Sequence, residues 1–141
     1  LVSAGACTWE EVINITKIVP KEKLILLHCV SAYPANFEDL NFPKMVKLKS
    51  LTDVIGYSGH HQTIDDAILA ISMGAKFIEK HFTIDNSLPG RDNEFAVLPS
   101  EFTKLNDFRN NYSNMMKDRG LDLQDKERDI FDNYRGRWSK S

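Results

Sequence analysis

The sequence predicts an α/β fold built around a parallel β-sheet. Short apolar runs alternate along the chain with segments whose apolar residues recur at helical spacing, and this order is typical of parallel sheets. The run "KLILLHCV" at 23–30 is apolar almost throughout, as expected of a strand that is covered on both faces. Two architectures fit: an open doubly wound sheet, or part of a (β/α)8 barrel. A complete barrel needs about 250 residues, so this chain would form half of one.

The first two strands are expected at 1–6 and 23–30, with one helix between them. Thr8 and Glu11 form the T-x-x-E pattern of a capping box, which predicts that the helix begins there, and Pro20 ends it. Because the chain opens directly on a strand, we expect it to be a fragment of a longer protein.

A short helix is expected around 43–49, after an irregular loop. Met45, Val46 and Leu48 are the apolar residues of this helix. The run "DVIGYS" at 53–58 then predicts the third strand.

The same alternation continues in the second half of the chain. Thr63 and Asp66 are the expected caps of the next helix, which Gly74 ends. The run "AKFIEKHF" at 75–82 predicts the fourth strand, and apolar residues keep helical spacing again over 102–118.

The composition is that of a soluble globular chain with at most one domain. The net charge of −2, without a basic cluster, indicates neither nucleic acid nor a membrane surface as a partner. No apolar run reaches the length that spans a membrane. Two cysteines, Cys7 and Cys29, are too few for a disulfide framework, so reduced thiols and a cytoplasmic location are expected.

Two neighbouring strands end in histidine, at His60 and at His81. Side chains alternate along a strand, so Ser58 shares a side with His60, and Glu79 shares a side with His81. In both candidate architectures, ligands bind at the carboxyl ends of the strands. Two imidazoles converging there can bind one metal ion and leave coordination positions open, as a catalytic site requires. The alternative for each histidine is a hydrogen-bonded loop residue.

Three motifs carry a resemblance to a known family: "HCVSAYP", "GYSGH" and "EKHFTIDNSLPGRD". In combination they resemble the sialic acid (N-acetylneuraminate) synthase family, which includes the legionaminate and pseudaminate synthases. The likeness covers about residues 1–118. It implies a TIM (β/α)8 barrel, with this chain covering about strands five to eight. Residues 1–120 would form the C-terminal half of that barrel. Residues 121–141 would form a charged C-terminal tail, with helical turns around 124–132.

The resemblance also implies an activity. Members of this family condense phosphoenolpyruvate with an N-acyl hexosamine resembling N-acetylmannosamine, form a nonulosonic (sialic-type) acid and release phosphate. A divalent metal ion, Mn²⁺ or Mg²⁺, assists. His60 and His81 match the metal ligands, and Glu79 matches the catalytic glutamate, which can orient or deprotonate the attacking water.

Four further positions match substrate-binding residues of the family. Ser31 and Ser58 match contacts to phosphoenolpyruvate, and Tyr33 and Asp92 match sugar-binding positions. The chain departs from the family pattern at Gly59, where many relatives have aspartate, and in the loop around Asp92. The resemblance implies that this loop faces the sugar, so the identity of the acceptor sugar stays open. A homo-oligomer is expected, and the fragment alone is expected to be inactive.

Two other functions fit the sequence. One is another barrel enzyme that joins phosphoenolpyruvate to an aldose, and the other is a non-catalytic α/β module that binds a sugar or a partner. His28 is expected in the core, His61 is not expected to be a ligand, and Cys29 is expected to pack rather than to react. In the tail, Trp138 is a candidate anchor for docking.

Overall fold

The structure is a computed structural model that describes residues 1–137. Its strands form one parallel sheet in the order β1-β2-β3-β4, which confirms the predicted α/β class. The strands are β1 Val2–Ser3, β2 Ile25–Cys29, β3 Val54–Gly59 and β4 Phe77–Lys80. Consecutive strands are therefore neighbours, and the order of these four does not reverse as it does in a doubly wound sheet.

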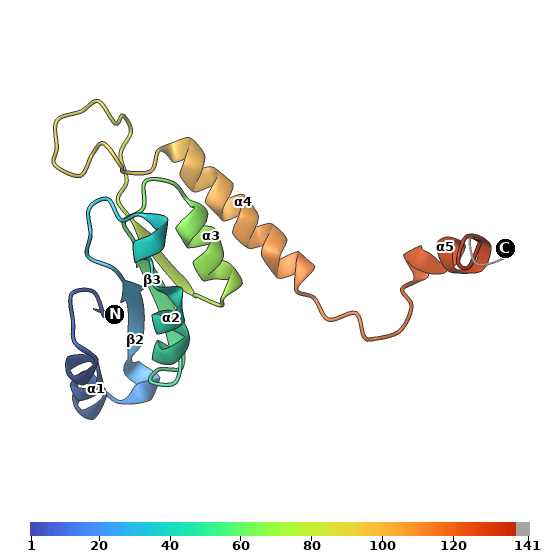
Figure 1. Ribbon diagram of the computed structural model, residues 1–141, viewed down its shortest axis with the longest axis horizontal. Coiled ribbons are helices and arrows are strands. Elements are labelled where there is room, and N and C mark those ends of the chain that lie inside the picture. Colours follow the sequence, from blue (N-terminus) through green and yellow to red (C-terminus); the bar gives the residue numbers. More distant parts are fainter. Residues whose placement is uncertain (138–141) are drawn as a thin grey trace.

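Helices fill the connections between the strands and continue beyond the last one (Figure 1). The α-helices are α1 Trp9–Ile18, α2 Phe42–Leu48, α3 Asp65–Ser72, α4 Pro99–Met115 and α5 Arg128–Asn133. Three 3-10 turns accompany them: η1 Lys21–Lys23, η2 Phe37–Asp39 and η3 Asp125–Glu127. Every helix that the sequence predicts is present, with ends shifted by a few residues.

The start of α1 follows the predicted capping box. The Thr8 hydroxyl accepts a hydrogen bond from the Glu11 N–H at 3.3 Å, and the Glu11 carboxylate accepts one from the Thr8 N–H at 2.7 Å. Both bonds satisfy backbone donors that the first helical turn leaves free. The preceding strand is shorter than predicted, because the chain turns at Ala6, which has a φ of 49°.

The predicted caps of α3 are wrong in one respect. Thr63 lies at the helix start and accepts a hydrogen bond from the Asp65 N–H at 3.3 Å, but the N-cap position is Ile64. Asp66 does not cap the helix. Its carboxylate is buried and accepts hydrogen bonds from Tyr57, Lys80 and the Ala67 N–H. Asp66 thus pairs with the buried ammonium of Lys80, and such charge-assisted hydrogen bonds are the strong ones.

The main core lies between one face of the sheet and helix α2. Side chains from β2 and β3 pack there against Phe42, Met45 and Leu48. His28 belongs to this core, as predicted: its Nε2 lies 2.8 Å from the Leu40 carbonyl oxygen, and burial lowers the pKa of its imidazole. A second cluster joins α3 to α4 through Ala67, Ile71 and Leu105.

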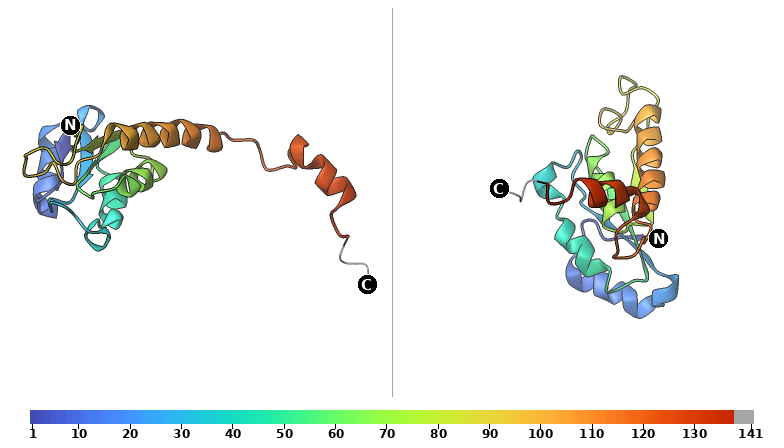
Figure 2. Two further views of the ribbon diagram at one scale, coloured as in Figure 1. Left: turned by 90° about the horizontal axis from the view of Figure 1, so that it is seen from above. Right: turned by 90° about the vertical axis from the view of Figure 1, so that its right-hand side faces the viewer.

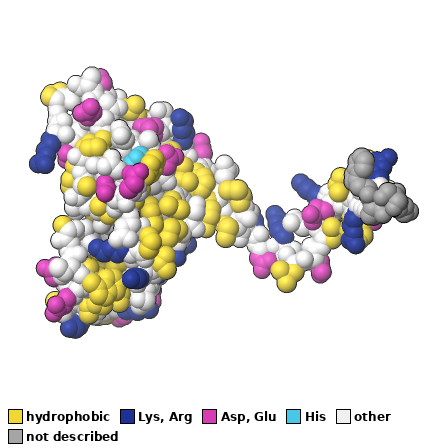
Figure 3. Space-filling model, in the orientation of Figure 1, with side chains coloured by type: hydrophobic (Ala, Val, Ile, Leu, Met, Phe, Trp, Pro, Cys, Tyr) yellow, Lys and Arg dark blue, Asp and Glu magenta, His cyan; other side chains and the backbone are white. Residues whose placement is uncertain are grey.

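The tail departs from the rest of the molecule. In Figures 1 and 2, α5 stands apart from the sheet, beyond an extended segment that follows α4. The 3-10 turn η3 and the helix α5 confirm the helical turns expected around 124–132. Apolar side chains are exposed on both the main body and the tail (Figure 3), and those of α5 include Ile130 and Phe131. Trp138 lies outside the described residues.

Within residues 1–137, no helix is long and apolar enough to cross a membrane.

Helix α2 offers a matched test of the packing. Met45 is 0% exposed, whereas Val46, also one of the apolar residues of this helix, is 56% exposed. Met45→Ala should lower the free energy of unfolding by about 2–5 kcal/mol, because it leaves a cavity in the core. Val46→Ala should change it by less than about 0.5 kcal/mol. Urea denaturation of both variants checks this, and equal losses would contradict the placement of α2.

Candidate functional site

The register of the sheet sets three polar side chains in a row. Cys29, Ser58 and Glu79 are aligned across β2, β3 and β4, on the face opposite to the one that packs against the helices. The Ser58 hydroxyl donates a hydrogen bond to Glu79 Oε1 at 2.7 Å. An ionised carboxylate only accepts hydrogen bonds, so this contact fixes the orientation of the Glu79 side chain.

Three aromatic rings meet just beyond these strand ends. The imidazole centroids of His60 and His81 lie 5.3 Å apart, with planes inclined at 70°. The Tyr33 ring lies 4.3 Å from the His60 ring and 6.0 Å from the His81 ring. The structure thus brings together both predicted metal ligands and one predicted sugar-binding residue. They come from the loops after β2, β3 and β4.

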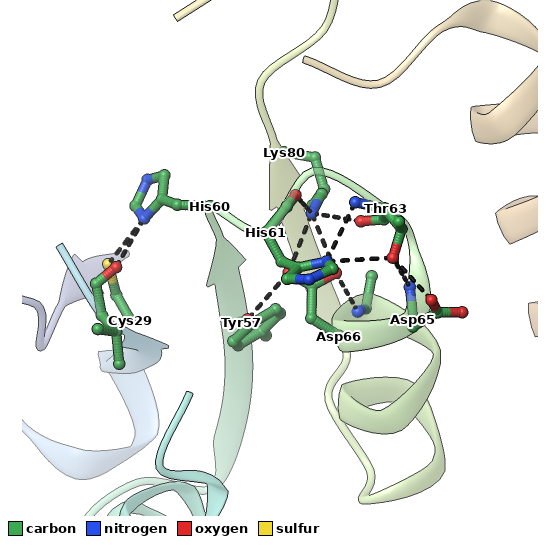
Figure 4. Close-up of polar contacts among 10 residues, drawn as sticks. Cys29, Tyr57, His60, His61, Thr63, Asp65, Asp66 and Lys80 are labelled. Carbon is green, nitrogen blue, oxygen red and sulfur yellow. Dashed lines mark hydrogen bonds and ion pairs between the residues drawn. The ribbon is translucent and has the colours of Figure 1, made fainter. Parts of the chain in front are cut away.

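Hydrogen bonding fixes the orientation of His60. Its Nδ1 lies 2.8 Å from the Val30 carbonyl oxygen, and the Cys29 sulfur is 3.9 Å from the same nitrogen. A carbonyl oxygen can only accept, so Nδ1 is the donor of this contact, and in the neutral imidazole Nε2 then keeps a lone pair. Metal-binding histidines commonly donate their second ring nitrogen to a backbone carbonyl in this way. Figure 4 shows His60 directed toward Cys29 and away from the neighbouring polar cluster.

The loop after β4 supplies the acidic side of the site. Asp92 Oδ2 lies 3.9 Å from His81 Nδ1, and both side chains are about one third exposed. The neighbouring Arg91 side chain is 91% exposed, with its Nε 4.0 Å from Asp92 Oδ1. Arg91 is therefore a solvated loop charge.

Two residues of this loop were missed by the sequence-based reasoning. Phe95 is buried, and its ring lies 5.2 Å from that of His81 and 6.5 Å from that of Tyr33. Asn86 holds the loop closed, because its side-chain amide donates to the carbonyls of Asn93, Glu94 and Ala96. Neither residue belongs to a periodic pattern, so the sequence offered no signal beyond the length of the loop.

The loop after β2 carries Ser31 and Tyr33. The Ser31 hydroxyl is 3.9 Å from the Cys29 sulfur, and the Ala35 N–H donates to the His60 carbonyl at 3.0 Å. This second contact joins the loop after β2 to the loop after β3. Gly5, in the loop after β1, approaches so closely that a Cβ there would lie 2.6 Å from both Cys29 Sγ and Ser31 Oγ. Only glycine permits that approach.

The two imidazoles of His60 and His81 fit a metal ion whose remaining ligands come from outside these two side chains. Among residues 1–137, no group of three or more histidine, cysteine or acidic side chains could hold a metal ion. His60 and His81 would contribute two nitrogens, and water, substrate or further chain would supply the rest. Such an incomplete set suits a catalytic ion better than a structural one.

His61 lies outside this group of residues. Its ring stacks on Phe37, with centroids 4.0 Å apart and planes inclined at 23°. Its Nδ1 accepts a hydrogen bond from the Thr63 N–H at 3.1 Å. This placement agrees with the expectation that His61 is not a ligand.

A buried ion pair lies behind the site, on the helix side of the sheet (Figure 4). Lys80 Nζ is 3.0 Å from Asp66 Oδ2, and the two side chains are 1% and 0% exposed. The Tyr57 hydroxyl donates to the same carboxylate at 3.0 Å. Burial lowers the pKa of Lys80, and the Asp66 carboxylate opposes that shift. Burial and Asp66 together raise the pKa of Tyr57, so its hydroxyl stays protonated and donates.

Comparison with known proteins identifies the family of this chain. The model of the NeuB family matches residues 1–120. Pseudaminic acid synthase of Campylobacter jejuni is 37% identical over 130 residues, covering 89% of this chain and 38% of the relative. N,N'-diacetyllegionaminic acid synthase of Legionella pneumophila is 40% identical over 113 residues, covering 74% of this chain and 32% of the relative.

A solved structure agrees with these sequence relatives. The crystal structure of N-acetylneuraminic acid (sialic acid) synthetase from Leptospira borgpetersenii, in complex with citrate, matches with a TM-score of 0.78 and 34% identity. The match covers 99% of this chain and 50% of that one. The chain therefore spans half or less of each of these three relatives. Together with the motifs at the strand ends, these findings confirm the resemblance seen in the sequence, and the chain belongs to the NeuB family.

Proposed function

We propose that the protein condenses phosphoenolpyruvate with an N-acyl hexosamine, forms a nonulosonic acid and releases phosphate. The observation that carries this proposal is the approach of the His60 and His81 ring centroids to 5.3 Å, directly after the strands that carry Ser58 and Glu79. The relatives named above are synthases of sialic-type acids. A module that only binds a sugar has no use for two imidazoles beside an oriented carboxylate.

We further propose that the chain forms strands five to eight of a (β/α)8 barrel. The unreversed strand order supports this arrangement, since doubly wound sheets reverse their order at the ligand site. The positions of the candidate residues also agree, because barrel enzymes carry their sites at the carboxyl ends of the strands.

His60 and His81 would hold the divalent ion, which supplies Lewis-acid polarisation of the sugar aldehyde. Their nitrogens favour Mn²⁺ over Mg²⁺, since magnesium sites are built almost entirely from oxygen. Asp92, beside His81, would accept hydrogen bonds from sugar hydroxyls, and the Tyr33 ring would cover the acceptor. Both side chains are accessible enough for such contacts.

Glu79 would orient and deprotonate the water that completes the reaction. One of its oxygens accepts from Ser58, which leaves the other oxygen for water. Ser58 has a single hydroxyl proton, so it cannot donate to Glu79 and to a substrate phosphate at once. Phosphoenolpyruvate binding would therefore turn the Ser58 hydroxyl from the carboxylate to the phosphate. Ser31, which is exposed, would add a second hydroxyl contact.

The two histidines are the first test. In the complete gene product, His60→Ala and His81→Ala should each abolish metal-dependent condensation without unfolding the protein, because each removes half of the nitrogen ligands. The assay follows phosphate release with saturating Mn²⁺. His61→Ala is the neighbouring control and should retain turnover, since its ring stacks on Phe37. Near-normal turnover in either ligand variant would refute the proposal.

Glu79 is tested by an isosteric change. Glu79→Gln should keep substrate and metal binding but reduce kcat by at least about a hundredfold, the scale of a positioned acid–base group. Glu94→Gln, on the exposed part of the loop after β4, is the control. If Glu79→Gln instead weakens binding while kcat per bound complex is unchanged, Glu79 is a ligand or a structural group.

The half-barrel arrangement has its own test. Within residues 1–137, β1 and β4 each pair with one neighbour, so each leaves an edge open. Open strand edges are templates for pairing with another chain. Expressed alone, residues 1–141 should therefore be inactive and self-associate in sedimentation experiments. A stable, cooperatively unfolding monomer at micromolar concentration would favour a self-contained open sheet.

A further inference from the structure

Lys80 makes an unusually complete set of contacts for a side chain in a strand. Its ammonium lies 2.6 Å from the His61 carbonyl oxygen, 2.8 Å from that of Thr63 and 3.0 Å from both carboxylate oxygens of Asp66. These acceptors use all three N–H groups of the ammonium. The side chain is 1% exposed, so water does not compete for them.

The position of Lys80 in β4 links this cluster to the site. Lys80 lies between Glu79 and His81 in the chain, and its side chain points to the opposite face of the sheet. The His61 carbonyl that it binds belongs to the residue directly after His60. One ammonium therefore connects the strand that carries Glu79 and His81 to the loop that carries His60.

The partners of Lys80 are themselves held in place. Asp66 accepts from the Tyr57 hydroxyl at 3.0 Å and from the Ala67 N–H at 2.8 Å. The cluster also leaves no room for a side chain at Gly59. A Cβ at Gly59 would collide with Asp66 Oδ2 and lie 2.6 Å from a Tyr57 ring carbon. In this chain, the carboxylate of Asp66 occupies the space that a side chain at 59 would need.

We infer that Lys80 is a positioning residue of the site: through the His61 and Thr63 carbonyls, it holds loop 60–63 so that His60 faces His81. Lys80 touches neither substrate nor metal in this account. Its effect on turnover rests on the proposed function, whereas its effect on the orientation of His60 does not. A purely structural ion pair would stabilise the fold and leave that orientation unchanged.

The test separates charge pairing from loop positioning. Lys80→Met leaves a buried carboxylate without its cation, and Asp66→Asn leaves a buried ammonium without its anion, so both single variants should lose stability. The double variant Lys80→Met/Asp66→Asn removes both charges and keeps an acceptor for Tyr57. Its urea midpoint should lie above those of the single variants.

The decisive readout is the imidazole ¹⁵N spectrum of His60 in the complete gene product without metal, assigned by comparison with His60→Gln. The wild type should show His60 protonated at Nδ1, and the double variant should show a mixture of tautomers. Its kcat should fall by about a hundredfold, the scale on which a misplacement of about 1 Å acts. Lys80→Arg keeps the cation and its donors, and should restore the single tautomer and the turnover.

A double variant with the wild-type His60 spectrum would overturn the inference, as would single variants whose turnover falls only in proportion to their folded fraction. If the wild type itself shows no condensation, the proposed function fails. The tautomer measurement then still decides whether Lys80 positions His60, because it requires neither substrate nor metal.

Discussion

The Lys80–Asp66 ion pair is the contact on which the geometry of the site depends. A charge can remain in a protein interior only when its partners are all present, and here they are two loop carbonyls and a carboxylate. Because those partners belong to the loop after β3 and to α3, the pair ties both to the end of β4. The constraint is local, yet it sets the relative positions of the two histidines.

The alternation of side chains along β4 lets one strand serve both the core and the site. Ile78 packs with the helices, and Lys80 reaches Asp66 on the same side. Glu79 lies on the opposite face beside Ser58, and His81 follows just past the strand end. A shift of one residue in register would exchange these faces and bury Glu79 among apolar side chains. The packing of the helices and the placement of the site are thus set together.

Much of the fold could be predicted because its determinants are local. The capping box at Thr8 and the apolar runs depend on neighbours in the sequence, and the structure has them where they were expected. Asp66 was assigned wrongly as a cap because its partner, Lys80, is 14 residues away and becomes a neighbour only in the folded sheet. Phe95 was missed for the same reason, since its contacts with Tyr33 and His81 cross between loops. Motifs at the strand ends located the site, but tertiary contacts determine its shape.

We propose that His60 and His81 bind one metal ion through their ring nitrogens. Pulsed electron–nuclear double resonance of Mn²⁺ bound to the complete gene product, labelled with ¹⁵N only at histidine, measures this directly. We expect hyperfine couplings from two coordinated imidazoles, with one lost in His60→Gln and the other in His81→Gln. A spectrum without histidine ¹⁵N couplings, or one unchanged by both substitutions, would contradict it.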